Sequence, residues 1–240
     1  MNTKPAPVAN DTLVYPGDEL RSPVNVLAPD QRNFHFGVTS IEVLYARISQ
    51  CSLNSYVPED IRVQFDTARN LYLHAFYVYR FYVVAERHVL TTLELAIREC
   101  IGDKTLAAFQ KQRKASGVNF TKGLRLYLEY LAQYQLIQNE DFPRWHRRNR
   151  MAAEDAYRDK VLKLMEEQGL KEYQWDESEI DESACDVEWD YVKVLCEILP
   201  KIRNNHSHGS TMLHNQVSLS FVNVSIIINK MFERTATAQK

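Results

Sequence analysis

The chain has 240 residues, which is enough for one large domain or for a domain with additions. Its net charge is −2 at pH 7, so any contact with nucleic acid must come from local basic patches rather than from the protein as a whole. Only seven glycines and several long apolar segments favour an all-helical fold over a sheet. The cysteines form no C-x-x-C pair and the first ten residues hold no apolar signal-peptide core, so we expect a reduced, cytoplasmic protein.

The first 57 residues are predicted to form an N-terminal arm and one short helix. Five prolines among polar residues before position 30 are typical of an extended lead-in. Thr39 or Ser40 is placed to cap a helix over residues 41–48, where apolar residues recur at helical spacing. The rest of the chain, residues 58–240, is predicted to be one helical domain with a charged insertion at about 140–187.

The longest helical signal runs from Pro58 to Cys100 and is closed by Gly102. At about 1.5 Å per residue, a helix of about forty residues would span roughly 60 Å, so we expect it to break. The predicted place is between Ala85 and Thr91, where charged residues interrupt the apolar pattern.

The segment Leu71–Ala85 is apolar nearly all round and rich in aromatic residues. A membrane span needs about 20 apolar residues, and this segment is shorter and contains Arg80. We therefore expect no membrane contact. A helix buried on most faces, with one face available as a subunit interface, accounts for the pattern.

The remaining helices are predicted from apolar spacing and from breakers. Gln112–Phe120 is predicted to be a basic loop, and Gly169–Asp186 an acidic loop or insertion. Asp186 or Asp190 starts a helix that Pro200 kinks or ends. The predicted helices after Gly102 cover residues 103–111, 121–138, 152–168, 190–199 and 217–232.

Polar residues gather in the stretch Leu199–His214, between two strongly apolar segments. It holds three of the seven histidines, and a proton-active patch between core-forming segments is where a site tends to be built. Arg203 carries a planar, positively charged guanidinium group, which is suited to binding phosphate. His208, five positions later, is of the type that exchanges protons near neutrality. Together they are sufficient parts for metal-free cleavage of RNA.

The run R-N-N-H-S-H at Arg203–His208 resembles the R-x4-6-H signature of the HEPN superfamily, including the polar residue after the arginine. As in that family, the run joins the last two predicted helices and is followed by Gly209 and an apolar helix. The resemblance covers roughly residues 60–235 in layout and is sharp only at 203–209. It implies an all-α, HEPN-like up-and-down helical bundle with long helices, of a kind that often acts as a dimeric, metal-independent RNase.

The resemblance also implies roles for individual residues. When the ribose 2′-OH attacks the adjacent phosphate, His208 would take or give the proton and Arg203 would stabilise the charge on the phosphate. Asn204 would orient the phosphate or hold the backbone turn. Glu86 or Glu94 could orient Arg203. The plainer alternative is a helix-end arginine that satisfies carbonyls and a histidine that caps the next helix.

The neighbouring histidines offer a second interpretation. His206 lies two residues before His208. Residues two apart in a helix point to different sides, so the two histidines need not act together, and His206 is treated as a supporting residue. A metal site built from His206, His208 and His214 is an alternative. No acidic residue or cysteine lies within the motif, however, so we expect neither a metal nor a cofactor.

A dense basic run, Arg144–Arg150, precedes the acidic stretch at residues 172–186. It could track a phosphate backbone, with Trp145 stacking on a base. Alternatively it is a solvated charge run that pairs with residues 172–186, which could fold over it as an autoinhibitory cover. The candidate RNA-binding residues are Arg144, Trp145, Arg147, Arg148 and Arg150.

One position departs from part of the resembled family. Ser210 stands where toxins neutralised by nucleotidyltransferase antitoxins carry a tyrosine, so neutralisation through that tyrosine is not expected. The leading hypothesis is a dimeric, metal-independent endoribonuclease of a toxin or phage-defence type, with RNA as substrate and an antitoxin or regulatory protein as a further partner. The alternatives are a non-catalytic HEPN module that binds nucleic acid, a nucleotide or a partner protein, and a helical structural protein with an accidental motif.

Overall fold

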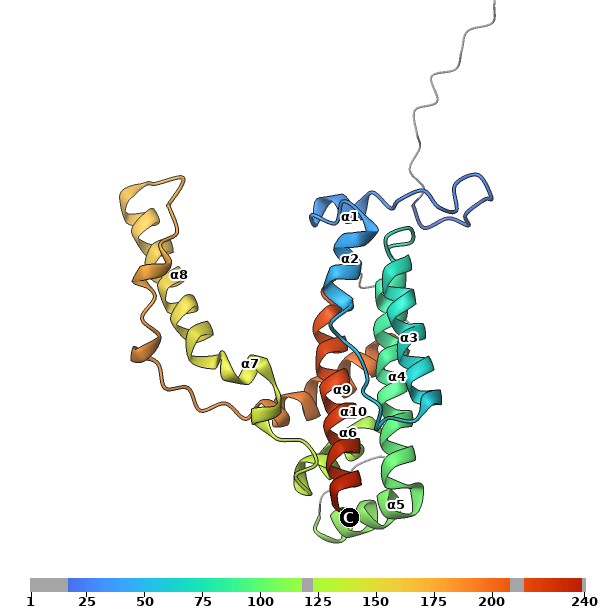
Figure 1. Cartoon of the computed structure of the whole chain (residues 1–240). Coiled ribbons are helices and arrows are strands. Elements are labelled where there is room, and N and C mark those ends of the chain that lie inside the picture. The colour runs from blue at the N-terminus through green and yellow to red at the C-terminus, as the bar shows by residue number, and fades with distance from the viewer. Residues whose placement is uncertain (1–16, 118–122, 208–213, 239–240) are drawn as a thin grey trace, which may run out of the picture.

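The computed structural model describes residues 17–117, 123–207 and 214–238. Within these ranges the chain forms helices and loops and no strand, which confirms the predicted all-α class (Figure 1). None of the described helices is long and apolar enough to cross a membrane. The α-helices are α1 (Arg32–His35), α2 (Ile41–Ile48), α3 (Glu59–His74), α4 (Phe81–Ile101), α5 (Asp103–Ala115), α6 (Leu124–Gln133), α7 (Pro143–His146), α8 (Arg148–Gln168), α9 (Tyr191–Ser207) and α10 (Ser218–Ala238). Short 3-10 helices lie at Asn139–Asp141, Glu177–Glu179 and Glu182–Ala184.

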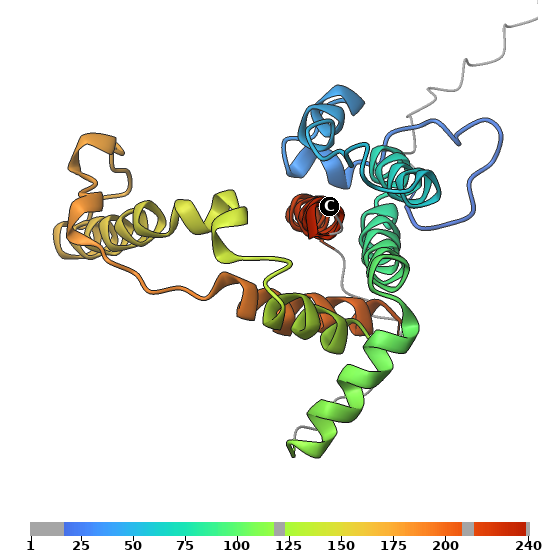
Figure 2. The ribbon, with the colours of Figure 1, turned by 60° about the horizontal axis from the view of Figure 1, so that its bottom comes forward.

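The bundle is built around α4, which contacts α3, α9 and α10. Figure 1 shows α2, α3, α4 and α10 running alongside one another, and Figure 2, seen nearly along α10, shows α6 and α9 lying across them. Their apolar faces meet in one core that includes Phe65, Tyr82, Leu93, Phe221 and Ile227. Polar side chains of α4 therefore meet partners from several other elements.

The long helical signal breaks earlier than predicted. Because α3 ends at His74 and α4 begins at Phe81, the predicted break between Ala85 and Thr91 is wrong. The charged residues that suggested it lie inside α4, and one of them, Glu86, is only 1% exposed. Partners from other elements compensate its buried charge, and a local pattern cannot display such compensation.

The turn between α3 and α4 contains no glycine or proline, and the N-terminal segment holds it instead. Asn33 Nδ2 donates to the carbonyls of Ala75 and Phe76, each at 3.0 Å. Asp30 accepts from the backbone N–H of Tyr79 at 3.2 Å. Since these partners are distant in sequence, the position of the turn had no local signal.

The helix predicted over residues 41–48 is confirmed as α2, with Ser40 at its N-cap position. Leu44 and Ile48 are buried in the main core. The segment that follows also reaches the core, through Cys51 and Val57. Much of the predicted N-terminal region is thus packed as part of the bundle.

The other predicted helices exist, with shifted ends. α5 continues to Ala115, beyond the predicted end at residue 111, and α8 begins at Arg148 rather than at 152. The helix predicted from residue 121 to 138 is shorter in the described part of the chain, where α6 ends at Gln133. Its predicted start at Thr121 lies outside the described residues.

The helix before the motif is longer than predicted. α9 continues through Pro200 to Ser207, so the alternative in which Pro200 ends the helix is wrong. The Asp190 carboxylate accepts from the backbone N–H of Lys193 at 3.0 Å, as expected of a helix start. The first residues of the motif therefore lie on a helix, which fixes the direction of their side chains.

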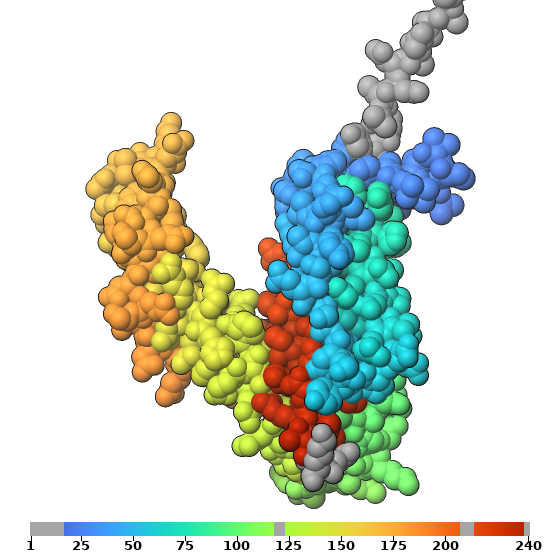
Figure 3. All heavy atoms as spheres, viewed as in Figure 1, coloured from blue at the N-terminus to red at the C-terminus, as the bar shows by residue number. Residues whose placement is uncertain are grey.

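The predicted charged insertion projects from the bundle as an arm (Figures 1 and 3). This α8 arm, residues 143–187, contains α7, α8 and the segment that returns along α8. A small apolar cluster of its own holds the return segment on the helix, and Lys160 pairs with Glu179 at 3.1 Å. The cluster consists of Ala153, Tyr157, Val161 and Ile180.

Candidate functional site

Two carboxylates of α4, Glu86 and Glu94, face the last turns of α9. They are eight residues apart, or about 12 Å along the helix. Arg203 and His206 are three apart on α9 and so lie on one face of it. The crossing of the two helices pairs Glu94 with Arg203 and Glu86 with His206.

Glu94 anchors Arg203. An Nη of Arg203 donates to Glu94 Oε2 at 2.9 Å, and the two side chains are 36% and 15% exposed. The other Glu94 oxygen accepts from the backbone N–H of Leu124, at the start of α6, at 3.0 Å. Arg203 also donates to Asn204 Oδ1 at 3.3 Å. The guanidinium is thus held in place while part of it remains open to water.

An open cleft of about 500 Å³ lies beside this pair, and Arg203 and Glu94 line it. Arg98, also in its wall, pairs with Asp103 at 2.9 Å, and both of those side chains are about half exposed. Such an exposed pair is weak and can exchange for another anion. This Arg203 cleft also presents His88, Thr91 and Tyr127. Its two guanidinium groups and its hydroxyls suit phosphate oxygens.

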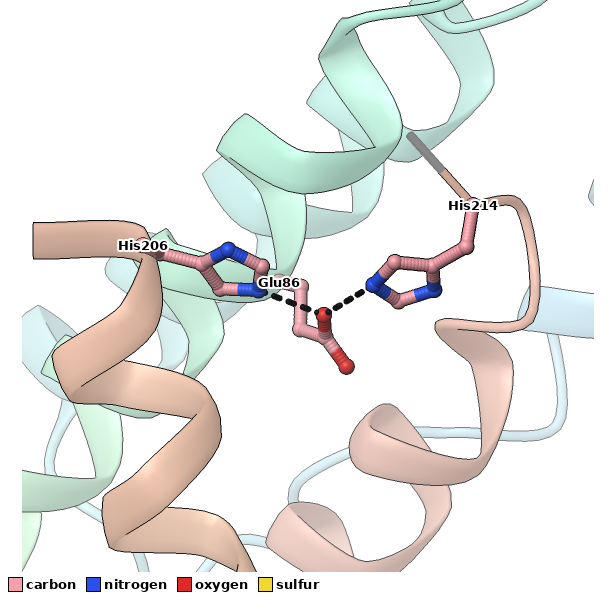
Figure 4. Close-up of side chains that lie close together, drawn as sticks. All are labelled: Glu86, His206 and His214. Atoms are coloured by element: carbon pink, nitrogen blue, oxygen red, sulfur yellow. Dashed lines mark hydrogen bonds and ion pairs between the residues drawn. The ribbon is translucent and has the colours of Figure 1, made fainter. Parts of the chain in front are cut away.

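Glu86, His206 and His214 form a second group, the Glu86 cluster (Figure 4). Glu86 Oε2 lies 2.7 Å from Nε2 of His206 and 3.2 Å from Nε2 of His214. Glu86 Oε1 accepts from the Ser220 hydroxyl at 2.6 Å. The carboxylate is 2% exposed, so these contacts replace the water that burial removes.

The contacts in the cluster favour the charged forms of Glu86 and His214. Burial alone would raise the pKa of Glu86, but hydrogen bonds from His214, Ser220 and His206 outweigh it and hold that pKa below its ordinary value. The hydrogen bond to Glu86 raises the pKa of His214, against a smaller opposite effect of burial. Glu86 therefore stays ionised, and His214 binds a proton more readily than a free histidine does.

A second, largely apolar cleft of about 370 Å³ reaches the Glu86 cluster between α9 and α10. Glu86 and His214 line it, whereas His206, at 6% side-chain exposure, lies deeper. This apolar cleft is walled by Trp189, Tyr191, Leu195, Ile198 and Leu219, with Arg144 also lining it.

The predicted catalytic residues differ in how far they can be placed. Arg203 and Asn204 lie together at the end of α9, but His208 lies outside the described residues. Glu86 and His206, both predicted to support the site, contact each other directly. Of the two carboxylates proposed to orient Arg203, the one in contact with it is Glu94.

Sequence reasoning missed the Arg203 cleft and the contact of His214 with Glu86. Glu86 carried a usable signal, because a carboxylate inside an otherwise apolar helix must find a buried partner. The cleft residue Arg98 had no such signal, since charged residues near helix ends are ordinary.

Part of the basic run is engaged within the protein. The indole N–H of Trp145 donates to the Trp189 carbonyl at 2.9 Å. The Arg148 guanidinium lies over the Trp145 ring, 3.9 Å from its centre, and donates to the Val187 carbonyl at 2.8 Å. One face of the indole that was predicted to stack on a base is therefore covered.

Of the other arginines in the basic run, Arg150 is paired, and Arg144 and Arg147 are exposed. Arg150 pairs with Glu154 at 2.8 Å and approaches Glu177, in the acidic stretch, at 3.8 Å. That contact agrees with the alternative in which the acidic stretch pairs with the run. Arg144 and Arg147 are exposed.

Fold and site together define an all-α helical bundle in which the end of α9 presents an arginine and a histidine to two carboxylates of α4. No family model, curated protein or solved structure matches the chain.

Proposed function

We propose that the protein is a metal-independent endoribonuclease of HEPN type, acting through Arg203 and His208. The observation that carries the proposal is the position of the Arg203 side chain. It is the first residue of the R-N-N-H-S-H run, and Glu94 holds it at the edge of an open cleft. An arginine that only capped helix carbonyls would not need a carboxylate from another helix to aim it.

In this proposal Arg203 stabilises the phosphorane-like transition state. Its planar fork can bind two phosphate oxygens at once. Because Glu94 and Asn204 already hold the side chain, little reorganisation is needed when charge builds up on the phosphate.

The Arg203 cleft supplies the binding surface for the RNA backbone. Arg98 can release Asp103 and contact a neighbouring phosphate, since their ion pair is half exposed. Arg144 and Arg147, exposed on the α8 arm, offer a further cationic surface. With a net charge of −2 for the whole chain, such local patches must provide the electrostatic attraction.

The proton transfers are assigned to His208. It takes the proton of the ribose 2′-OH while the 2′-oxygen attacks phosphorus, and the bond to the 5′-oxygen breaks. His208 then gives that proton to the leaving 5′-oxygen, and the products are a 2′,3′-cyclic phosphate and a 5′-hydroxyl. We further propose that two copies of the chain form the active cleft, as the family resemblance implies, and that the enzyme is a toxin or phage-defence effector controlled by an antitoxin or regulatory protein.

The test is cleavage of a panel of structured RNAs in EDTA by four full-length proteins. These are wild type, Arg203→Ala, His208→Ala and the control Lys201→Ala, which removes an exposed cation from the same helix. We expect wild type and the control to cleave alike and to leave cyclic phosphate ends. Loss of either catalytic residue should slow cleavage by about 100-fold or more.

Two other outcomes separate the alternatives. RNA binding by wild type that Arg203→Ala weakens, without cleavage by any of the four proteins, would favour a non-catalytic binding module. Equal cleavage by wild type and by folded Arg203→Ala would refute the proposed site. Sedimentation of each protein reports whether it is a dimer.

A further inference from the structure

We propose that Glu86, His206 and His214 bind a divalent metal ion, and that zinc fits the site best. The proposal stands apart from RNA cleavage, because it concerns the Glu86 cluster and not the Arg203 cleft. The sequence led us to expect no metal, because no acidic residue lies within the motif, with a site of His206, His208 and His214 as the alternative. The proposed site keeps His206 and His214 of that alternative and adds Glu86, which is 120 positions upstream of His206.

The donor atoms already converge. Glu86 comes from α4, His206 from the end of α9 and His214 from the segment before α10. One ligand atom from each, a carboxylate oxygen and two imidazole nitrogens, all lie within 4.8 Å of one another. Figure 4 shows both rings directing a nitrogen toward the carboxylate. Two histidines and a glutamate are a ligand set that zinc commonly uses.

The distances leave only a small adjustment for the ion. Zinc bonds to nitrogen and oxygen of about 2.1 Å place tetrahedral ligand atoms about 3.4 Å apart. The two nitrogen–oxygen separations are 2.7 and 3.2 Å. The Glu86–His206 separation would have to grow by about 0.7 Å and the Glu86–His214 separation by about 0.2 Å to reach that tetrahedral spacing. Most of the adjustment therefore falls on Glu86 and His206, whereas His214, at 34% exposure and outside the helices, needs to move little.

The Glu86 carboxylate supplies the one negative charge among the three ligands. With both histidines bound as neutral imidazoles, it offsets half of the charge of a zinc ion at this buried site.

A second group of contacts fixes the carboxylate. The Ser220 hydroxyl donates to the Glu86 oxygen that does not face the histidines, which orients the carboxylate as outer partners of metal ligands do. Glu86 and His214 also line the apolar cleft. Three protein ligands leave a fourth position open, and the apolar cleft is where water or a small ligand would reach it.

The consequence for the fold is a cross-link. An ion at this point would tie the end of α9 and the segment before α10 to the second turn of α4. Its ligands His206 and His214 lie on either side of His208 in the sequence, so the ion would restrain both ends of the segment that carries that residue.

The test uses full-length protein freed of metal with a chelator and then desalted. Zinc is titrated in competition with a chromophoric chelator, and cobalt(II) reports the coordination by its visible spectrum. Wild type is compared with His214→Ala and with His74→Ala, which removes an exposed histidine at the end of α3. His214→Cys keeps a ligand at the position and should add a sulfur-to-cobalt charge-transfer band.

We expect wild type and His74→Ala to bind one zinc per chain and to melt at a higher temperature with zinc. His214→Ala should bind it at least about 100-fold more weakly, as expected when one of three ligands is lost. Equal zinc binding by folded wild type and His214→Ala would overturn the proposal, as would no binding by wild type. Because the readout is metal binding, neither result depends on whether the protein cleaves RNA.

Discussion

Glu86 and Glu94 lie about two turns apart on α4, and each contacts a basic residue of α9, yet their surroundings differ. The Glu86 side chain is 2% exposed and its partner His206 is 6% exposed. Glu94 is 15% exposed and its partner Arg203 is 36% exposed. The first pair is almost fully buried, although the apolar cleft reaches Glu86, and the second is partly exposed at the edge of the Arg203 cleft.

This difference in burial separates two roles for the same chemical group. A carboxylate that is almost fully buried must be satisfied mainly by protein partners, because little water can replace a lost one. Glu86 accordingly collects contacts from two histidines and a serine. A carboxylate at the edge of a cleft can share its partner with an incoming anion, and so Glu94 can position Arg203 without occupying it fully.

The largest expected effect is a loss of stability when the buried pair of Glu86 and His206 is broken. Glu86→Gln keeps the shape of the side chain but removes the charge that the two histidines contact. Removing one partner from a buried ion pair costs about 3 kcal/mol or more. Urea unfolding at pH 6 with EDTA should show a loss of that size in the free energy of unfolding.

The matched control is Glu94→Gln on the same helix. An exposed or partly exposed pair contributes about 1 kcal/mol or less, and the glutamine oxygen can still accept from the Leu124 N–H. If both variants lost equal stability, burial would not be what distinguishes the two carboxylates.

The dependence of stability on pH should report the same Glu86 cluster in metal-free protein. The lowered pKa of Glu86 gives stability that is present above its ordinary value of 4.5 and is lost as the pH falls through its folded value. The raised pKa of His214 gives stability that is present below its ordinary value of 6.5 and is lost as the pH rises through its folded value. The free energy contributed by the cluster should therefore be largest between these two ordinary values.

That window can be measured by repeating the urea unfolding across the pH range. The difference in stability between wild type and Glu86→Gln should shrink toward acid and toward alkaline pH. A difference that did not change with pH would mean that the cluster is held by packing rather than by charge.

A smaller loss is expected from Ser220→Ala. The Ser220 hydroxyl donates to the buried carboxylate at 2.6 Å, and a hydrogen bond to a charged group contributes about 1.5–3 kcal/mol. Ser225→Ala is the control on the same helix, since its buried hydroxyl donates to the carbonyl of Val222 within α10. Thermal unfolding should separate the two variants, with the control close to wild type.

Helices and loops that depend on the residues within them were predictable from the sequence. Those that depend on contacts with distant residues were not. The apolar spacing of residues 41–48 correctly gave α2, and the acidic composition of 169–186 gave a segment without long helices. The turn before α4 was misplaced, because Asn33 and Asp30 hold it from the N-terminal segment.

The candidate site shows the same limit. Local spacing singled out Arg203, Asn204 and His206. It could name Glu86 and Glu94 only as candidates, because which carboxylate meets which base depends on how α4 and α9 cross. The alternative in which Pro200 ends the helix was wrong for a related reason, since α9 continues beyond it and packs against α4 and α6.

The smallest expected effect concerns the open pair and rests on the proposed nuclease activity. If Glu94 acts by positioning Arg203, Glu94→Gln should slow RNA cleavage by about 10-fold, equivalent to about 1.4 kcal/mol in the barrier. The double variant with Arg203→Ala should then be no slower than Arg203→Ala alone, because Glu94 has nothing left to position. Multiplying effects in the double variant would mean that Glu94 acts on RNA or on the fold by a route that does not pass through Arg203. Measured unfolding of all three variants separates those two routes, since a structural role would lower stability as well as the rate.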